Sequence, residues 1–218
     1  MRILGLSSAT KVISLGLIDE EKVLVETTMA NPQAEKLVFY LEEAGVDPKQ
    51  LDGVAVTQGP GSYSGLRGGL AMAKTLAQTL KIPIVGISTL EAIAYNIIDI
   101  EGTMMVILDA RHDEYNVAMF GASGGALRRV TEDQVCKFVG LLDKIKNISG
   151  DIWLVGATKE FKEVKGANYH FADETHSQPY GINVAKLGLP LIKAGQVADP
   201  LTLVPNYSHQ PNIREYNR

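Results

Sequence analysis

The chain contains a single cysteine, Cys136, among 218 residues. One cysteine excludes an internal disulfide and a zinc site built from several thiolates. The surrounding residues 133–138 read as the start of an amphipathic helix. We therefore expect Cys136 to be a half-buried structural residue rather than a catalytic thiol.

The chain also lacks a long apolar run and an excess of positive charge. No run approaches the ~18–20 apolar residues that a membrane span needs, and no basic region followed by a cleavable apolar stretch opens the sequence. We expect a cytoplasmic protein without membrane contact. Its 21 Lys and Arg against 25 Asp and Glu give a formal net charge of −4, which argues against autonomous binding of nucleic acid.

Residues for metal or nucleophilic chemistry are sparse. The chain has four histidines, and no two lie four residues apart, as two metal ligands on one helix face would. His170 and His176 flank Asp173 and Glu174 in a polar stretch that reads as a solvated loop. There is no nucleophile elbow and no suggestive carboxylate pair. We expect no metal site and no catalytic residue.

Hydrophobic patterning predicts an α/β protein with two lobes. The first half reads as βββαβαβα, which is typical of a ribonuclease-H-like lobe, and the second half roughly repeats it from about Gly102. We expect domains at 1–101 and 102–218, the second smaller and degenerate, with a tail after Asp199 that packs loosely or against another chain. The predicted elements are strands 2–6, 12–18, 23–28, 53–57, 84–87, 103–109, 115–120, 127–130 and 152–156, and helices 31–44, 65–80, 133–144 and 183–194, with a further helix capped by Ser88 or Thr89.

A glycine-rich loop at residues 58–67 is the most informative segment. It follows a predicted strand and opens a helix, and its three glycines and one proline leave little side-chain bulk. Unpaired amides at the helix start would suit an anion. The spacing matches neither a P-loop nor a strict GxGxxG motif. A phosphate site and a tight strand-to-helix turn both remain open on this pattern.

The loop and its surroundings resemble the TsaB (YeaZ) family. Residues 59–67 read Gly-Pro-Gly-Ser-Tyr-Ser-Gly-Leu-Arg, the long motif that carries most of the resemblance. Matching segments fall in order over about residues 1–120, and the remainder is similar only in length and in a Pro-x-Tyr ending at 205–207. The matching segments are residues 2–10, 59–67, 83–92 and 107–115.

The resemblance implies two ribonuclease-H-like lobes of the actin, sugar-kinase and heat-shock ATPase superfamily. It also implies a non-catalytic subunit required for N6-threonylcarbamoylation of tRNA adenosine next to the anticodon. The implied partners are a TsaD-type catalytic subunit and a TsaE-type ATPase, with a homodimer when the chain is alone and tRNA bound only through the complex. No cofactor of its own is implied, although ATP or ADP could lie at a partner interface.

Four residues are candidates for nucleotide or interface contacts. Ser7 stands where most TsaB-like chains carry Asp, and its hydroxyl can donate to a phosphate but brings no charge to attract Mg²⁺. Asp109 is a better-placed carboxylate, although a strand-end turn or pairing with Arg111 explains it equally well. The other three candidates are Gly61, Ser62 and Arg67.

Two first-lobe helices carry more apolar surface than one core stripe requires. The helix over 65–80 has a second, flat side of small residues, which lets another helix approach closely. Burial inside the chain is the alternative, and the family resemblance favours a partner. The predicted partner-binding residues are Phe39, Tyr40, Gly68, Ala71, Met72 and Thr75.

Two other functions fit the predicted fold. A small-molecule kinase or ATPase of the same superfamily is the main alternative, and ATP turnover by the purified chain would favour it. A peptidase is less well supported because the sequence offers no nucleophile–base pair.

Overall fold

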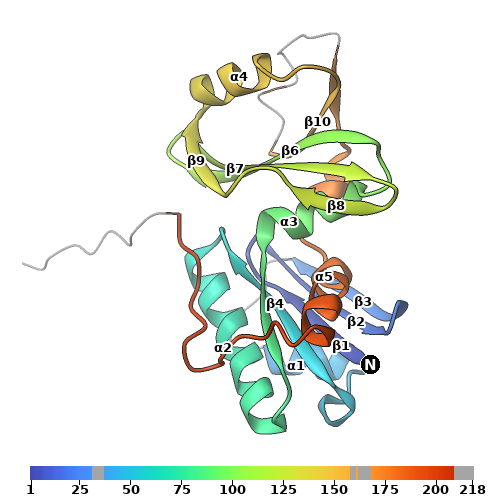
Figure 1. Cartoon of the computed structure of the whole chain (residues 1–218). Coiled ribbons are helices and arrows are strands. Elements are labelled where there is room, and N and C mark those ends of the chain that lie inside the picture. Colours follow the sequence, from blue (N-terminus) through green and yellow to red (C-terminus); the bar gives the residue numbers. More distant parts are fainter. Residues whose placement is uncertain (31–36, 158–160, 162–167, 209–218) are drawn as a thin grey trace, which may run out of the picture.

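The computed structural model describes residues 1–30, 37–157, 161 and 168–208, which form two lobes, each built on one sheet (Figure 1). The first sheet has the order β3-β2-β1-β4-β5. Three antiparallel strands lead into a parallel β1-β4-β5 arrangement. Its strands are β1 (Arg2–Ser7), β2 (Val12–Asp19), β3 (Lys22–Ala30), β4 (Gly53–Gly59) and β5 (Ile84–Ser88).

The second sheet repeats this topology. Its order is β11-β10-β6-β7-β8, with β9 also paired to β7. Read from its other edge, the sheet places an antiparallel β8-β7-β6 meander beside two parallel strands, as in the first lobe. This βββαβα-type arrangement confirms the predicted fold class. The strands are β6 (Gly102–Arg111), β7 (Glu114–Ser123), β8 (Ala126–Arg129), β9 (Gln134–Lys137), β10 (Ile152–Gly156) and β11 (Tyr169–Phe171).

Helices cover both faces of the first sheet (Figure 1). Alternate residues of β1 divide between two cores, because Leu4 and Leu6 pack in one cluster with Leu70, while Ile3 packs in another with Val184. No helix among the described residues is long and apolar enough to cross a membrane. The helices are α1 (Leu37–Glu43), α2 (Tyr63–Leu80), α3 (Thr89–Ala94), α4 (Phe138–Lys146) and α5 (Gly181–Lys193), with short 3₁₀ turns η2 (Pro48–Gln50), η3 (Tyr95–Ile97) and η5 (Glu174–Ser177).

The segment around Cys136 differs from its prediction. Instead of starting a helix at residue 133, it forms β9, in which Cys136 lies opposite Tyr115 of β7. Helix α4 begins only at Phe138. A short strand and a short amphipathic helix share apolar positions over four residues, so their periodicity does not separate them. Cys136 is half-buried, and burial raises the pKa of its thiol. The start predicted for the first helix, at 31–36, lies outside the described residues.

Helix α5 returns from the second half of the chain to pack on the first sheet, where it contacts β1, β2, β4 and β5. The approach is backbone to backbone. A Cβ on Gly5 would lie 2.0 Å from the carbonyl O of Gly181, and one on Gly16 would lie 2.1 Å from the amide N of Ile182. Only glycine fits such contacts without moving the helix. The division expected at residue 102 separates the two sheets, but α5 belongs by packing to the first.

Two first-lobe side chains hold the N-terminus of α5. The Ser14 hydroxyl accepts from the Gly181 amide at 2.8 Å and donates to Glu26 Oε1 at 2.7 Å. Glu26 Oε2 accepts from the Ile182 amide at 3.0 Å. Burial raises the pKa of the Glu26 carboxyl, against the opposing effect of these hydrogen bonds. The sheet thus supplies the caps that α5 lacks in its own sequence.

The tail also differs from its prediction. Residues 198–208, which we call the C-terminal strap, pack on the first lobe of the same chain. Ala198 bridges to Ile84 of β5, and the amide of Asn206 donates to the carbonyl O of Gln58 at 2.7 Å. Leu203 is 9% exposed and belongs to the first-lobe core. Backbone hydrogen bonds and one buried leucine therefore hold a segment whose polar composition suggested loose packing.

We expect Gly5→Ala to destabilise the protein by about 1–3 kcal/mol, because the added methyl collides with the backbone of α5. Urea unfolding followed by circular dichroism measures this loss. Gly140→Ala on α4 is the matched control. A Cβ there meets nothing within 4 Å, so this variant should be neutral or stabilised by up to about 1 kcal/mol. Equal stability of Gly5→Ala and wild type would contradict the backbone contact.

Candidate functional site

The glycine-rich loop packs against the β1–β2 turn. The amide of Ser62 donates to the carbonyl O of Ala9 at 2.7 Å. A Cβ on Gly61 would lie 2.3 Å from that oxygen, and one on Gly65 would lie 2.1 Å from the carbonyl O of Ser8. The glycines are thus needed for close approach within the chain itself. This explains the loop without any ligand.

Helix α2 begins at Tyr63, two residues earlier than predicted. Its N-cap is Ser62, whose hydroxyl accepts from the Gly65 amide at 3.3 Å. Ser64 is exposed and lies inside the helix. The first-turn amides are therefore partly satisfied by the chain, which leaves fewer of them for an anion.

Ser7 lies at the end of β1 and is fully buried. Its hydroxyl oxygen accepts from Thr57 Oγ1 at 3.4 Å. The neighbouring Ser8 hydroxyl donates to the carbonyl O of Gly65 at 2.8 Å. Of the four nucleotide candidates, Ser7, Gly61 and Ser62 therefore meet around one turn. Contact between a nucleotide and these residues stays a prediction.

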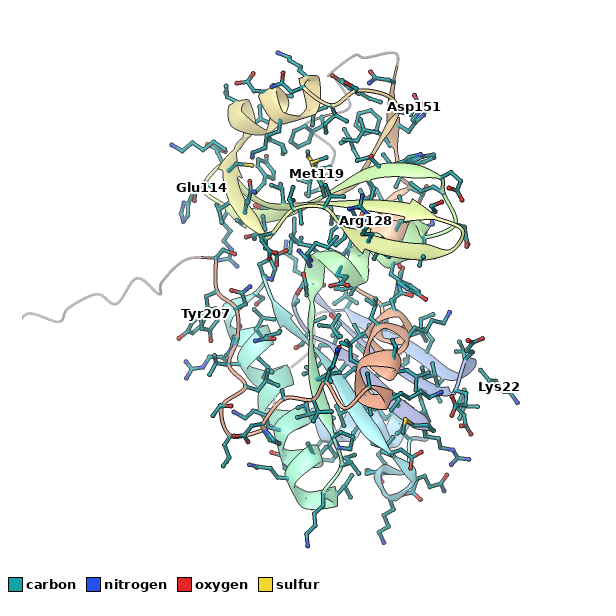
Figure 2. The ribbon with its side chains drawn as sticks, in the orientation of Figure 1. Lys22, Glu114, Met119, Arg128, Asp151 and Tyr207 are labelled. Carbon is teal, nitrogen blue, oxygen red and sulfur yellow. The ribbon has the colours of Figure 1, made fainter. Side chains whose placement is uncertain are left out.

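Arg67 lies apart from that cluster, in an exposed position one turn along α2. Its Nη1 donates to the Tyr63 hydroxyl at 3.0 Å, and its guanidinium carbon lies 5.2 Å from the centroid of the Tyr63 ring. The Tyr63 ring stacks in turn on Tyr207 of the C-terminal strap, with centroids 4.8 Å apart and planes 28° apart. Figure 2 shows Tyr207 beside the end of α2 that is nearer the second lobe.

The outward side of α2 is flat and carries small residues. Ala71 and Thr75 are exposed, and Gly68 is half-buried. Met72 differs from its expected place, because it is 8% exposed and packs in the first-lobe core. Helix α1 contacts α2, and Leu41 of α1 belongs to the same core cluster as Met72.

Helix α1 contributes one exposed aromatic residue. The Phe39 side chain is 62% exposed, whereas Tyr40 is half-buried and packs against the first-lobe core. Phe39 lies on α1, which contacts α2. We call Phe39, Gly68, Ala71 and Thr75 the helix face.

The second lobe offers less. Asp109 is exposed, and its Oδ1 accepts from the Arg111 amide at 2.7 Å, as expected for a strand-end turn. His170 Nε2 lies 3.3 Å from Asp151 Oδ1, and its ring stacks on Trp153. Across the described residues, no three His, Cys, Asp or Glu side chains gather in a way that could hold a metal ion.

A charged cluster joins the two lobes. Arg129 Nη1 of β8 lies 2.6 Å from Asp133 Oδ1, and its Nη2 lies 3.4 Å from Glu91 Oε2 of α3. Ser88 Oγ donates to Asp133 Oδ2 at 3.3 Å.

An open pocket of about 290 Å³ lies next to Ser88. Its other lining residues are Gln58, Gly59, Val204, Pro205 and Asn206.

Two lobes that each join an antiparallel three-stranded meander to two parallel strands define a protein of the ribonuclease-H-like βββαβα fold class. The family model described as "TsaD: tRNA N6-adenosine threonylcarbamoyltransferase" matches residues 34–184. The match covers well over half of the sequence, and the chain belongs to this family.

The resemblance to TsaB (YeaZ) proteins is confirmed by a relative. "tRNA threonylcarbamoyladenosine biosynthesis protein TsaB" of Bacillus subtilis is 28% identical over 221 residues, which cover 95% of this chain and 93% of the relative. The similarity therefore extends past residue 120, where the recognisable motifs end.

Solved structures support the fold. YeaZ from Pseudomonas aeruginosa superposes with a TM-score of 0.79 at 22% identity, covering 94% of this chain and 99% of that one. The ethanolamine utilization protein EutJ from Carboxydothermus hydrogenoformans has a TM-score of 0.52 at 12% identity, covering 85% of this chain and 89% of that one. At these identities, the likeness concerns the fold alone.

Several residues of this region were missed from the sequence. The sequence predicts no site role for Tyr63, which is only part of the loop motif, or for Thr57, which is only the end of a strand. The Pro-x-Tyr ending at 205–207 was the one available signal for Tyr207. Nothing in the spacing indicates that Tyr207 stacks on Tyr63, because that contact arises only when α5 returns the chain to the first lobe.

We expect Ser62→Ala to lower the free energy of unfolding by about 0.5–2 kcal/mol, because the N-cap of α2 is lost. Chemical denaturation monitored by circular dichroism provides the measurement. Ser64→Ala, two residues away and exposed, should stay within about 0.5 kcal/mol of wild type. If the two variants lose equal stability, Ser62 is not the cap.

Proposed function

We propose that this chain is a non-catalytic subunit required for N6-threonylcarbamoylation of tRNA adenosine next to the anticodon. Its partner is a TsaD-type catalytic subunit, and a TsaE-type ATPase completes the assembly. The observation that carries the proposal is the helix face, a flat surface of small residues with one exposed phenylalanine. The relative's printed name, a threonylcarbamoyladenosine biosynthesis protein, supplies the pathway.

The proposal of a non-catalytic role rests on the end of β1. Ser7 brings no negative charge there and is fully buried, with its hydroxyl bonded to Thr57. The neighbouring loop is packed by the β1–β2 turn. These contacts support a lobe that has kept the superfamily's fold and uses its loop to shape α2. ATP or ADP would then bind at the partner interface rather than in this chain alone.

Small residues on α2 suit helix-to-helix contact. Gly68 and Ala71 present almost no side chain, so a partner helix could approach closely and exclude water from Phe39. The same surface would let two copies pair when the chain is alone. tRNA would be bound through the complex, because the net charge of −4 gives this chain no overall attraction for phosphates. A tRNA substrate also places the assembly in the cytoplasm.

The direct test is reconstitution. The purified chain, a TsaD-type subunit, a TsaE-type ATPase and tRNA are mixed with ATP and the threonylcarbamoyl donor, and modified adenosine is measured. Modification should require the chain, and the chain alone should show neither transferase nor ATPase activity above background. Metal-dependent ATP turnover by the chain alone that disappears in Asp109→Ala would instead favour the kinase or ATPase alternative.

We expect Ala71→Arg to weaken binding of the TsaD-type partner by about 100-fold or more, because the interface would bury a charge without a partner. Isothermal titration calorimetry gives the affinity. Without the partner, the free energy of unfolding of this variant should stay within about 0.5 kcal/mol of the wild-type value, since Ala71 is exposed. Gly68→Arg should behave alike in binding.

Val139→Arg is the matched control for this test. Val139 lies on α4 of the second lobe and is 69% exposed. It therefore receives the same new charge on an apolar surface position outside the helix face. If Ala71→Arg and Val139→Arg bind the partner equally well, the helix face is not the interface.

A further inference from the structure

The C-terminal strap contacts α2 at the start and in the middle of the helix. Lys74 Nζ donates to the carbonyl O of Leu203 at 3.0 Å, in the middle of the helix. Near the start of the helix, Tyr207 stacks on Tyr63. Figure 1 shows the strap, in red, running along one side of α2 towards the second lobe.

The strap is anchored independently of α2 as well. Asn206 donates its amide to Gln58, and Gln58 Nε2 donates to the carbonyl O of Val204 at 2.8 Å. Ser208 Oγ donates to Asn116 Oδ1 of β7, so the strap also reaches the second lobe. Tyr207 is thus held between two fixed neighbours along the chain. The backbone of the strap on both sides of Tyr207 is therefore held by contacts that do not involve Tyr63.

Arg67 depends on Tyr63 for its position. The guanidinium lies over the Tyr63 ring and donates to its hydroxyl, and no carboxylate among the described residues forms an ion pair with it. Arg67 lies one turn in from the positive end of the helix dipole of α2, so the helix itself does not stabilise this cation. Tyr63 is 42% exposed. The ring of Tyr207 is the aromatic surface that restricts Tyr63.

We propose that the C-terminal strap positions Arg67 for partner binding through the stacked pair Tyr207 and Tyr63. The proposal rests on the proposed function, since the TsaD-type partner is the protein that binds the positioned Arg67. Arg67 precedes Ala71 by one turn on the exposed side of α2, at the rim of the helix face. The matching group on the partner is an acidic side chain or a phosphate. An ordered guanidinium loses less freedom on binding it than a mobile one.

A double-mutant cycle tests the link. Tyr207→Ala should weaken partner binding by about two- to tenfold, the range for loss of one aromatic pair. In an Arg67→Ala background, the same substitution should change binding by less than about twofold, because the group that it positions is gone. Tyr207→Phe keeps the stacked ring and removes only the hydroxyl contact with Tyr63, so it should lose less affinity than Tyr207→Ala. Isothermal titration calorimetry on the full chain supplies all the affinities.

Two outcomes would overturn the proposal. The first is an equal loss from Tyr207→Ala with and without Arg67, which would mean that the strap contributes independently of the guanidinium. The second is a Tyr207→Ala variant that binds the partner with wild-type affinity, while Arg67→Ala binds it more weakly than wild type does. A variant of the strap's outer surface, Leu201→Ala, adds a check. Leu201 is 74% exposed, and a large loss there would assign the strap to direct partner contact instead.

A readout without any partner separates this proposal from the proposed function. Amide hydrogen exchange of residues 63–68 in the free chain should be faster in Tyr207→Ala than in wild type and unchanged in Tyr207→Phe. If the wild-type chain binds no TsaD-type subunit, the proposed function fails, and this exchange measurement still decides whether the strap orders the start of α2. Unchanged exchange in Tyr207→Ala would refute that ordering.

Discussion

The packing of α5 on the first sheet is the constraint on which the rest of the structure depends. Gly5 and Gly16 remove the side chains that would separate the helix from β1 and β2, and Gly181 does the same from the helix side. Ser14 and Glu26 then bond the helix N-terminus to the sheet. This contact joins a C-terminal helix to the N-terminal lobe. It fixes where the strap starts and therefore where the strap meets α2.

The absence of side chains at glycine also explains the glycine-rich loop. In a nucleotide-binding protein, glycines at this place let the backbone approach a phosphate. Here the space opposite Gly61 and Gly65 is filled by carbonyl oxygens of Ala9 and Ser8. The hydroxyls of Ser7 and Thr57 bond to each other instead of facing an open site. The same glycine-rich motif can thus serve ligand binding or internal packing. Which of the two it serves depends on whether the neighbouring turn fills the space opposite the glycines.

The sequence predicted the described strands except β9 and β11, because the others are short apolar runs bounded by turn residues. It did not predict the strand around Cys136, where four residues are too few for the period to be read. It placed Met72 on the outward side of α2, but that side chain is buried in the first-lobe core. The stack of Tyr63 on Tyr207 joins distant segments, so only the folded chain reveals it. Exposed positions such as Ala71 followed from helical geometry alone.

The return of α5 also sets an order of events during synthesis on the ribosome. One face of the first sheet, with Ile3, Val85 and Ile87, is completed only when Val184 and Leu189 arrive. Until then, an apolar surface made early in translation stays open while the whole second lobe is synthesised. Such a surface invites chaperone binding or misassembly. The nascent chain therefore cannot complete its first lobe until α5 has left the ribosomal exit tunnel.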